Sequence, residues 1–188
     1  MDSNITALID ALDNDPELRT QAQKSLVALG AEAVEPLIAA VRSESGRKVW
    51  GALQVLGEMG DARALPVILE SLRSTTPIII SAAVAALQKF PNEDVAMHLI
   101  EALPHTRGMG QQDMIVMLQR LGDTRAIPLL IEQLGTVESP PLRVAIIQAL
   151  GKLGDPSAIP AIKAYADDPD HHVRDWVVVA LEQLGAEN

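Results

Sequence analysis

The stretch GDPSAIPAIKAYADDPDHHVRDWVVVALEQLG, residues 154–185, has the pattern of a helix, a short break and a second helix. A Gly-Asp pair opens it, a proline follows six residues after the glycine, and Leu-x-x-Leu-Gly closes it. Its closing glycine stands where a further copy of the same unit would begin. We therefore expect the chain upstream to contain more copies in the same phase.

The glycines that close this unit recur along the chain with a period near 31 residues. They are Gly30, Gly60, Gly122, Gly154 and Gly185, spaced by 30, 62, 32 and 31 residues, and Pro91 takes the slot missing from the longest interval. Four residues before the six slots stand Leu26, Leu56, Leu87, Leu118, Leu150 and Leu181. Eight residues after the first five stand Ile38, Ile68, Leu99, Leu130 and Ile162. A period of this length maintained along a chain predicts a stack of helix pairs.

Start and stop signals divide the chain into six pairs, approximately 1–29, 31–59, 61–90, 92–121, 123–153 and 155–184, within a single domain spanning 1–188. Second helices are expected to begin at Asp15-Pro16 and Thr76-Pro77, where proline suits the first helical position. Residues that follow the closing slots and can cap the next helix are Asp61, Asn92, Asp123 and Asp155.

Composition narrows the classes of function. The chain of 188 residues carries a net charge of −10, which counts against nucleic acid or an anionic membrane as the main ligand. It contains no cysteine, so disulfide and thiolate chemistry are excluded. The start MDSNITALID is not a signal peptide, and no apolar run approaches the ~18 residues of a membrane span. We expect a cytoplasmic protein.

The repeat resembles HEAT-like repeats of the short type first associated with phycobilisome lyase subunits. The matching residues in one copy are Gly122, Asp123, Ala126, Pro128, Leu129, Leu142, Arg143, Ala145, Ala149, Leu150, Leu153 and Gly154. The resemblance covers essentially the whole chain. It implies an all-α fold, a right-handed α-α superhelix (solenoid) of about six HEAT-like helix pairs, in which the second helices line the concave face. Partners of such proteins usually bind that face.

Projected through this resemblance, the partner-binding residues of the concave face are Arg47, Trp50, Gln54, Ile78, Ser81, Ala82, Ala85, Met109, Gln112, Asp113, Val116, Val144, Gln148, His172, Asp175, Trp176 and Val179. An apolar stripe runs through Trp50, Ile78, Ala82, Val116, Val144, Trp176 and Val179. A continuous exposed apolar strip marks an interaction site, and tryptophan is a favoured hot-spot residue. The alternative is that these side chains pack on one another.

Two other clusters have a structural and a functional interpretation. The tract ADDPDHHVRD, residues 166–175, could hold a metal through His171, His172 and its aspartates, but Asp168-Pro169-Asp170 also reads as a helix start, which we favour. Arg19, Arg143 and Arg174 share one slot of the second helix. They could bind an anion, or form a structural ladder to Asp123, Asp155 and their equivalents in neighbouring repeats, and we favour the ladder.

No catalytic constellation is present, and we expect no metal and no cofactor. The leading hypothesis is a non-enzymatic scaffold or adaptor that binds a protein or peptide partner on the concave face, with an acidic rim suited to a basic, hydrophobic segment. The alternative, from the repeat type, is a bilin lyase subunit or a phycobilisome-associated chromophore-handling protein, with Arg47, Asp113 and Asp175 as contacts. A third hypothesis is a fragment of a larger protein, in which the apolar final helix, WVVVALEQL, self-associates or meets another domain.

Overall fold

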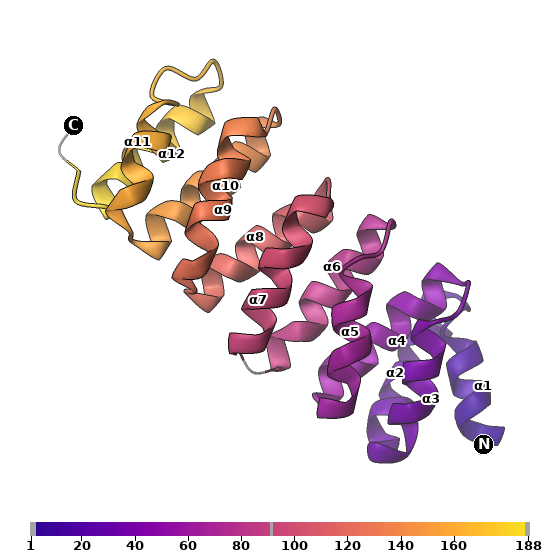
Figure 1. The fold of residues 1–188 in the computed structure, drawn as a ribbon. Helices are drawn as coiled ribbons and strands as arrows, with labels where there is room; N and C mark the ends of the chain where they lie inside the picture. Colours follow the sequence, from indigo (N-terminus) through magenta and orange to yellow (C-terminus); the bar gives the residue numbers. More distant parts are fainter. Residues whose placement is uncertain (1–2, 91, 187–188) are drawn as a thin grey trace. The chain divides into compact units, whose positions relative to one another are not determined.

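The structure is a computed structural model that describes residues 3–90 and 92–186, with side chains described for 3–90 and 95–186. All regular elements in this part are helical (Figure 1). The α-helices are α1 (Ser3–Ala11), α2 (Pro16–Leu29), α3 (Ala31–Val41), α4 (Gly46–Met59), α5 (Leu65–Ser71), α6 (Pro77–Ala86), α7 (Asn92–Ala102), α8 (Met109–Leu121), α9 (Ile127–Thr136), α10 (Pro140–Leu153), α11 (Ile159–Lys163) and α12 (His171–Gln183). The expectation of an all-α chain of helix pairs is confirmed.

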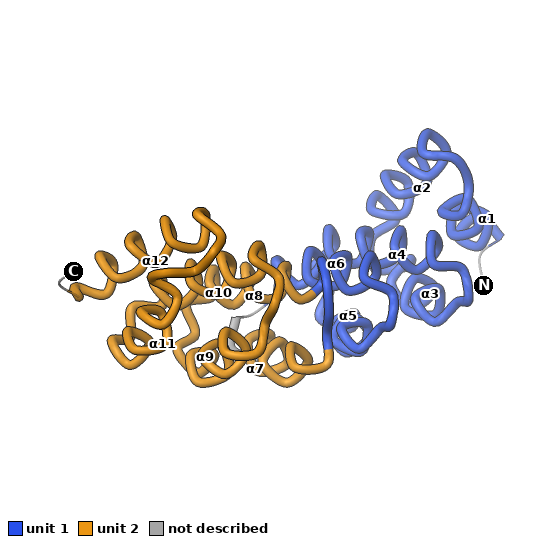
Figure 2. The backbone as a smooth tube through the Cα atoms, turned by 90° about the horizontal axis from the view of Figure 1, so that it is seen from above, with its two compact units in different colours: residues 1–91, 106–110 blue, residues 92–105, 111–188 orange. Residues whose placement is uncertain are grey.

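The helices form two compact units (Figure 2). Unit 1 contains residues 1–91 and 106–110, and unit 2 contains residues 92–105 and 111–188. In unit 1 the first helices α1, α3 and α5 lie on one side and α2, α4 and α6 on the other. In unit 2 the first helices α7, α9 and α11 form one layer, and α8, α10 and α12 form the other. The assignment of 1–188 to a single domain stays a prediction.

The apolar positions of the repeat form the core of each unit. All six leucines that precede the closing slots are buried, from Leu26 to Leu181. Ile68, Leu99, Leu130 and Ile162 are buried as well, but Ile38 is only half-buried and Leu37 is fully buried instead. α3 begins at Ala31, directly after Gly30, whereas α5, α9 and α11 are each preceded by a short 3-10 turn.

The predicted caps are present where the side chains are described. Asp61, Asp123 and Asp155 each accept a hydrogen bond from the backbone N–H two residues later, at the start of the 3-10 turns η1 (Ala62–Ala64), η4 (Thr124–Ala126) and η5 (Pro156–Ala158). Asp15 caps α2 in the same way, whereas Thr76 makes no side-chain cap for α6. The predictions on Pro91 and on the Asn92 side chain lie outside the described residues.

Second helices of neighbouring repeats approach each other closely at two equivalent glycines. Gly57 and Gly151 both stand three residues before a closing glycine. A Cβ added to Gly57 would lie 2.5 Å from Ala86 Cα, and one added to Gly151 would lie 2.9 Å from Ala180 Cα. The pairs α4–α6 and α10–α12 are therefore packed backbone against backbone, with no room for a larger side chain. This packing holds α10 and α12 at the spacing that shapes the site described next.

No helix within the described ranges combines the length and the apolar character that crossing a membrane would require.

Candidate functional site

A groove opens on the second-helix side of unit 2, between α8, α10 and α12. Its volume is about 350 Å³, within the usual range of ~300–1,000 Å³ for ligand pockets. The residues that line it are Gln112, Val116, Pro140, Pro141, Val144, Ala145, Gln148, Asp170, His172 and Trp176. We call this surface the α8–α10–α12 groove. Six of its ten residues belong to the predicted concave-face set, namely Gln112, Val116, Val144, Gln148, His172 and Trp176.

The groove is mainly apolar. Val116 is 41% exposed, a large fraction for a valine, and Val144 and Trp176 are half-buried beside it. The amides of Gln112 and Gln148 supply neutral hydrogen-bonding groups from neighbouring helices, and they need no pairing while water reaches them. Such a surface can take an apolar group and hydrogen-bond to polar atoms next to it.

Four lining residues lie outside the predicted set, namely Pro140, Pro141, Ala145 and Asp170. Pro140 begins α10 and Asp170 is the N-cap of α12, where it accepts a hydrogen bond from His172 N at 2.8 Å. Asp170 belongs to a helix start that the sequence indicated, whereas Pro140 had not been singled out. The first turns of α10 and α12 form part of the groove rim. Conversely, Asp113, Asp175 and Val179 lie on the same helices but do not line the cavity itself.

A buried ion pair fixes the approach to α12. Arg143 Nη1 donates to Asp168 Oδ2 at 2.9 Å, and the Asp168 side chain is 2% exposed. The same arginine donates through Nε to Val137 O at 3.1 Å, and Arg174 Nη1 donates to Asp168 O at 2.7 Å. Arg143 therefore ties α10 to the loop between α11 and α12, next to the turn that carries Asp170 and His172.

The prediction that these arginines are structural is confirmed, but the predicted partners are wrong. Asp123 pairs with Arg125, two residues away, and Asp155 accepts from Ser157 N. Arg19 donates to the carbonyl oxygens of Leu12 and Asn14. In each case an aspartate at a helix start satisfies its own turn, so it is not available to an arginine of another repeat.

In unit 1 the predicted residues are placed differently. Arg47, Gln54, Ile78, Ala85 and Met109 are exposed, and Ser81 is half-buried. Ala82 is only 5% exposed, and its part in a binding surface stays a prediction. Gln54 accepts a hydrogen bond from Gln23 at 2.7 Å. Trp50 is half-buried, and the Arg19 guanidinium lies over its ring at 5.4 Å from the centroid.

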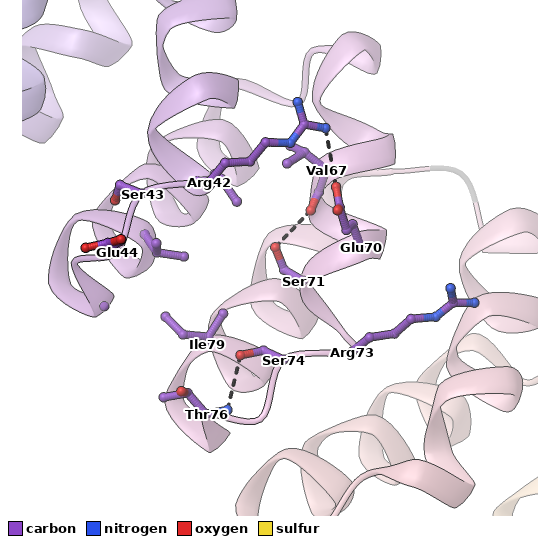
Figure 3. Close-up of a pocket in the computed structure, with 13 residues that line it drawn as sticks. Arg42, Ser43, Glu44, Val67, Glu70, Ser71, Arg73, Ser74, Thr76 and Ile79 are labelled. Carbon is purple, nitrogen blue, oxygen red and sulfur yellow. Dashed lines mark hydrogen bonds and ion pairs between the residues drawn. The ribbon is translucent and has the colours of Figure 1, made fainter.

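A second pocket, of about 620 Å³, lies among the loops of unit 1 that join α3 to α4 and α5 to α6 (Figure 3). Val41, Val49, Val67 and Ile79 contribute its apolar residues. Its charged groups do not converge. Arg42 pairs with Glu70 at 3.3 Å, and in Figure 3 the Arg73 side chain points away from Ser43 and Thr76. Because its polar groups do not converge, this pocket does not indicate a class of ligand.

The two adjacent histidines do not form a metal centre with the aspartates around them. The rings of His171 and His172 lie 3.9 Å apart between centroids. Asp168 forms an ion pair with Arg143, and Asp170 accepts a hydrogen bond from the α12 backbone. No group of three or more His, Cys, Asp or Glu with a geometry for metal binding occurs in the part of the chain that the structure describes. Capping, the favoured interpretation of this tract, is confirmed for Asp170.

The exposed surface of the final helix carries both apolar and charged side chains. Val177, Ala180 and Leu181 are buried against the preceding repeat. Val178 is 45% and Val179 36% exposed, and they stand among the exposed side chains of Arg174, Asp175 and Glu182. Self-association through this helix stays a prediction.

Comparisons with known proteins agree with the repeat architecture. The family of HEAT repeats matches residues 5–88, 34–109 and 96–182. The uncharacterized phycocyanin operon protein Z of Pseudanabaena tenuis (strain PCC 7409) is 26% identical over 180 residues, which cover 90% of this chain and 89% of that protein. Bilin biosynthesis protein PecF of Mastigocladus laminosus is 30% identical over 188 residues, covering 97% and 80%. A designed armadillo repeat protein solved in complex with the peptide (KR)4 superposes with a TM-score of 0.61 at 16% identity, covering 97% of this chain and 100% of the other.

Proposed function

We propose a function for this chain on the basis that it belongs to the HEAT-repeat family. It is a non-enzymatic interaction module, and its α8–α10–α12 groove binds a segment of another protein. The observation that carries this proposal is the groove itself, a concave and mainly apolar surface with a half-buried tryptophan. Solvent-exposed apolar surface that is hollowed and bordered by polar groups is typical of recognition sites.

Further support comes from the way the groove is built. Its three walls are helices, and the walls α10 and α12 are packed together at Gly151 and tied by Arg143 to the loop before α12. A binding surface that is rigid before the partner arrives loses less conformational entropy on binding. The solved complex of a designed armadillo repeat protein with a peptide shows that the fold is able to present a peptide-binding surface.

The test is capture of proteins from a lysate of the source organism on immobilised chain. The variant Trp176→Ala removes the largest side chain of the groove and should abolish capture of the partner. The matched control is Val178→Ala, since Val178 is exposed on the same helix but does not line the groove. Both variants should keep the helical circular dichroism spectrum of the parent chain. Equal capture by the Trp176→Ala variant and the parent would refute the proposal.

A second candidate function is binding of a bilin. It is favoured by the similarity of this chain to two proteins whose names refer to phycocyanin or to bilin biosynthesis. The similarity extends over 90% of this chain for a protein of a phycocyanin operon and 97% for a bilin biosynthesis protein. The groove argues for the protein segment instead. A bilin carries two propionate groups, and the lining residues include aspartate but neither lysine nor arginine. Of the contacts suggested from the sequence, Arg47 lies in unit 1, whereas Asp113 and Asp175 lie in unit 2.

Titration with phycocyanobilin separates the two candidates. The protein-segment function predicts an absorbance spectrum equal to that of the free pigment at every chain concentration. A spectral shift that saturates, and that is lost in Trp176→Ala but kept in Val178→Ala, would establish the bilin function in place of the first.

A further inference from the structure

We infer that the occupant of the α8–α10–α12 groove is a short segment with one large apolar side chain, flanked on both sides by lysine or arginine. This inference rests on the proposed function and names the chemistry of the partner. It also assigns recognition to unit 2 alone, in place of the continuous stripe from Trp50 to Trp176 that the sequence suggested.

The size and lining of the groove call for a single apolar anchor. A volume of about 350 Å³ is near the lower end of the range for ligand pockets, ~300–1,000 Å³. Its apolar groups face one another across three helices, with Val116 on α8, Val144 on α10 and Trp176 on α12. An anchor inserted between them loses its contact with water on several sides at once. That is the environment in which one side chain contributes most of the binding energy.

Beside the anchor site, carboxylates outnumber cations that have no carboxylate partner. Asp170 lines the groove, and Asp113 on α8 and Asp175 on α12 lie within one helical turn of Gln112 and Trp176. Within the described residues, none of these three aspartates forms an ion pair. Of the nearby cations, Arg143 pairs with Asp168, and Arg174 keeps its positive charge while it donates to backbone carbonyls, so the three aspartates leave a net negative charge. Uncompensated carboxylates on both α8 and α12 attract cations on both sides of an anchor held between them.

The amide side chains supply what the main chain of the segment needs. A backbone that follows its anchor into an apolar groove must find partners for its N–H and C=O groups. Gln112 on α8 and Gln148 on α10 each offer a donor and an acceptor at the groove wall. These contacts do not depend on the sequence of the segment. Selectivity is therefore left to the anchor and to its charged flanks.

Other occupants fit less well. A bilin would place its carboxylates among three aspartates. A second copy of this chain would bring a net charge of −10 to an acidic surface, and the two copies would repel each other. A protein partner with basic residues around its anchor is the occupant that the charges favour.

The inference is tested with synthetic peptides and the Trp50→Phe variant, in which Trp176 is the single tryptophan. Three peptides have a central phenylalanine, flanked on both sides by lysine and arginine in the first, by serine in the second and by glutamate in the third. A fourth peptide has a central alanine between lysine and arginine flanks. Trp176 fluorescence reports occupancy of the groove. We expect the basic-flanked phenylalanine peptide to bind at least about tenfold more tightly than the serine-flanked or alanine-centred peptides, with no binding of the acidic one. Its affinity should fall with added salt.

A double variant, Asp113→Asn with Asp175→Asn, tests the charges without changing side-chain size. It should weaken the basic-flanked peptide several-fold and flatten its salt dependence, while the serine-flanked peptide binds as before. Equal affinities for basic, neutral and acidic flanks would overturn the inference and leave the proposed function intact. If no peptide alters Trp176 fluorescence, the inference is wrong. The proposed function fails separately, when Trp176→Ala retains its lysate partner.

Discussion

The guanidinium of Arg19 lies over the ring of Trp50, with its central carbon 5.4 Å from the ring centroid. Arg19 is held there by hydrogen bonds to the carbonyl oxygens of Leu12 and Asn14. One face of Trp50 is therefore already covered within unit 1. Trp176, by contrast, lines an open groove in unit 2. The two tryptophans, which the sequence had assigned to one binding stripe, therefore lie in different surroundings.

The first prediction follows from this difference. Trp50→Ala should lower the free energy of unfolding, because it removes a half-buried aromatic ring and a cation-π contact worth ~0.5–1 kcal/mol. It should leave partner capture unchanged once the chain is folded. Chemical denaturation and lysate capture measure the two effects separately. Loss of capture in a chain that remains folded would place Trp50 back in the binding surface.

The second prediction concerns the buried ion pair. Arg143→Ala leaves the Asp168 carboxylate buried without its partner, which should cost about 3–5 kcal/mol of stability. The control is Arg125→Ala, because Arg125 is 51% exposed in its pair with Asp123 and its loss should cost less than about 1 kcal/mol. Urea denaturation followed by circular dichroism gives both values. Equal losses of unfolding free energy in the two variants would show that the buried ion pair stabilises the fold no more than the exposed one.

The third prediction uses the close packing of α10 and α12. Gly151→Ala should destabilise the chain, since the added Cβ would lie 2.9 Å from Ala180 Cα and overpacking costs about 1–3 kcal/mol. The loss outweighs the gain in helix propensity of ~1 kcal/mol. Gly135→Ala is the matched control, because Gly135 lies in α9 with nothing within 4 Å of an added Cβ, and this variant should be stabilised. A rise in Tm for both variants would refute the backbone-to-backbone packing.

The fourth prediction concerns Asp61, whose pKa is lowered from 3.8 to about 2, mainly by the hydrogen bond from the Arg63 side chain and next by the Arg63 backbone N–H. A carboxyl with a lower pKa in the folded state stabilises the fold above its unfolded pKa, and that contribution is lost as the pH falls through the folded value. For Asp61 the loss should occur between about pH 4 and pH 2. Stability measured across this window should fall less in Asp61→Asn.

The Arg63→Ala variant separates the two causes. NMR titration should show the pKa of Asp61 rising toward 3.8 but remaining below it, because the backbone N–H at position 63 still donates. The pKa of Asp155 is lowered by the Ser157 backbone N–H and should not change in this variant. An Asp61 pKa that is unaffected by the variant would exclude the guanidinium as the main cause.

The sequence alone predicted the parts of this fold that depend on short-range signals. The repeat period, the six buried leucines and the aspartate caps all follow from residues a few positions apart. The missing 3-10 turn before α3 could not be predicted, because Gly30 resembles the other closing glycines while taking a different backbone conformation, with φ 58° and ψ −134°. In α3 the buried core position is Leu37 and not Ile38.

The sequence predicted part of the site, because some of its residues follow the helical period. Helical periodicity places Val116, Val144 and Trp176 on equivalent faces of α8, α10 and α12, and all three line the groove. Periodicity does not describe the loop between α11 and α12, so the pairing of Arg143 with Asp168 was missed. It also does not say which exposed positions are covered by neighbours, as the buried Ala82 shows.

Photo-crosslinking tests the central claim most directly. A photoreactive phenylalanine analogue replaces Val116, inside the groove, or Val178, exposed on α12 outside it. Irradiation in native lysate should join a protein to the chain with the probe at position 116, and Trp176→Ala should remove that adduct. The same protein should not be joined from position 178. Crosslinking from position 178 alone, or an adduct at position 116 that persists in Trp176→Ala, would contradict the assignment of this groove as the binding site.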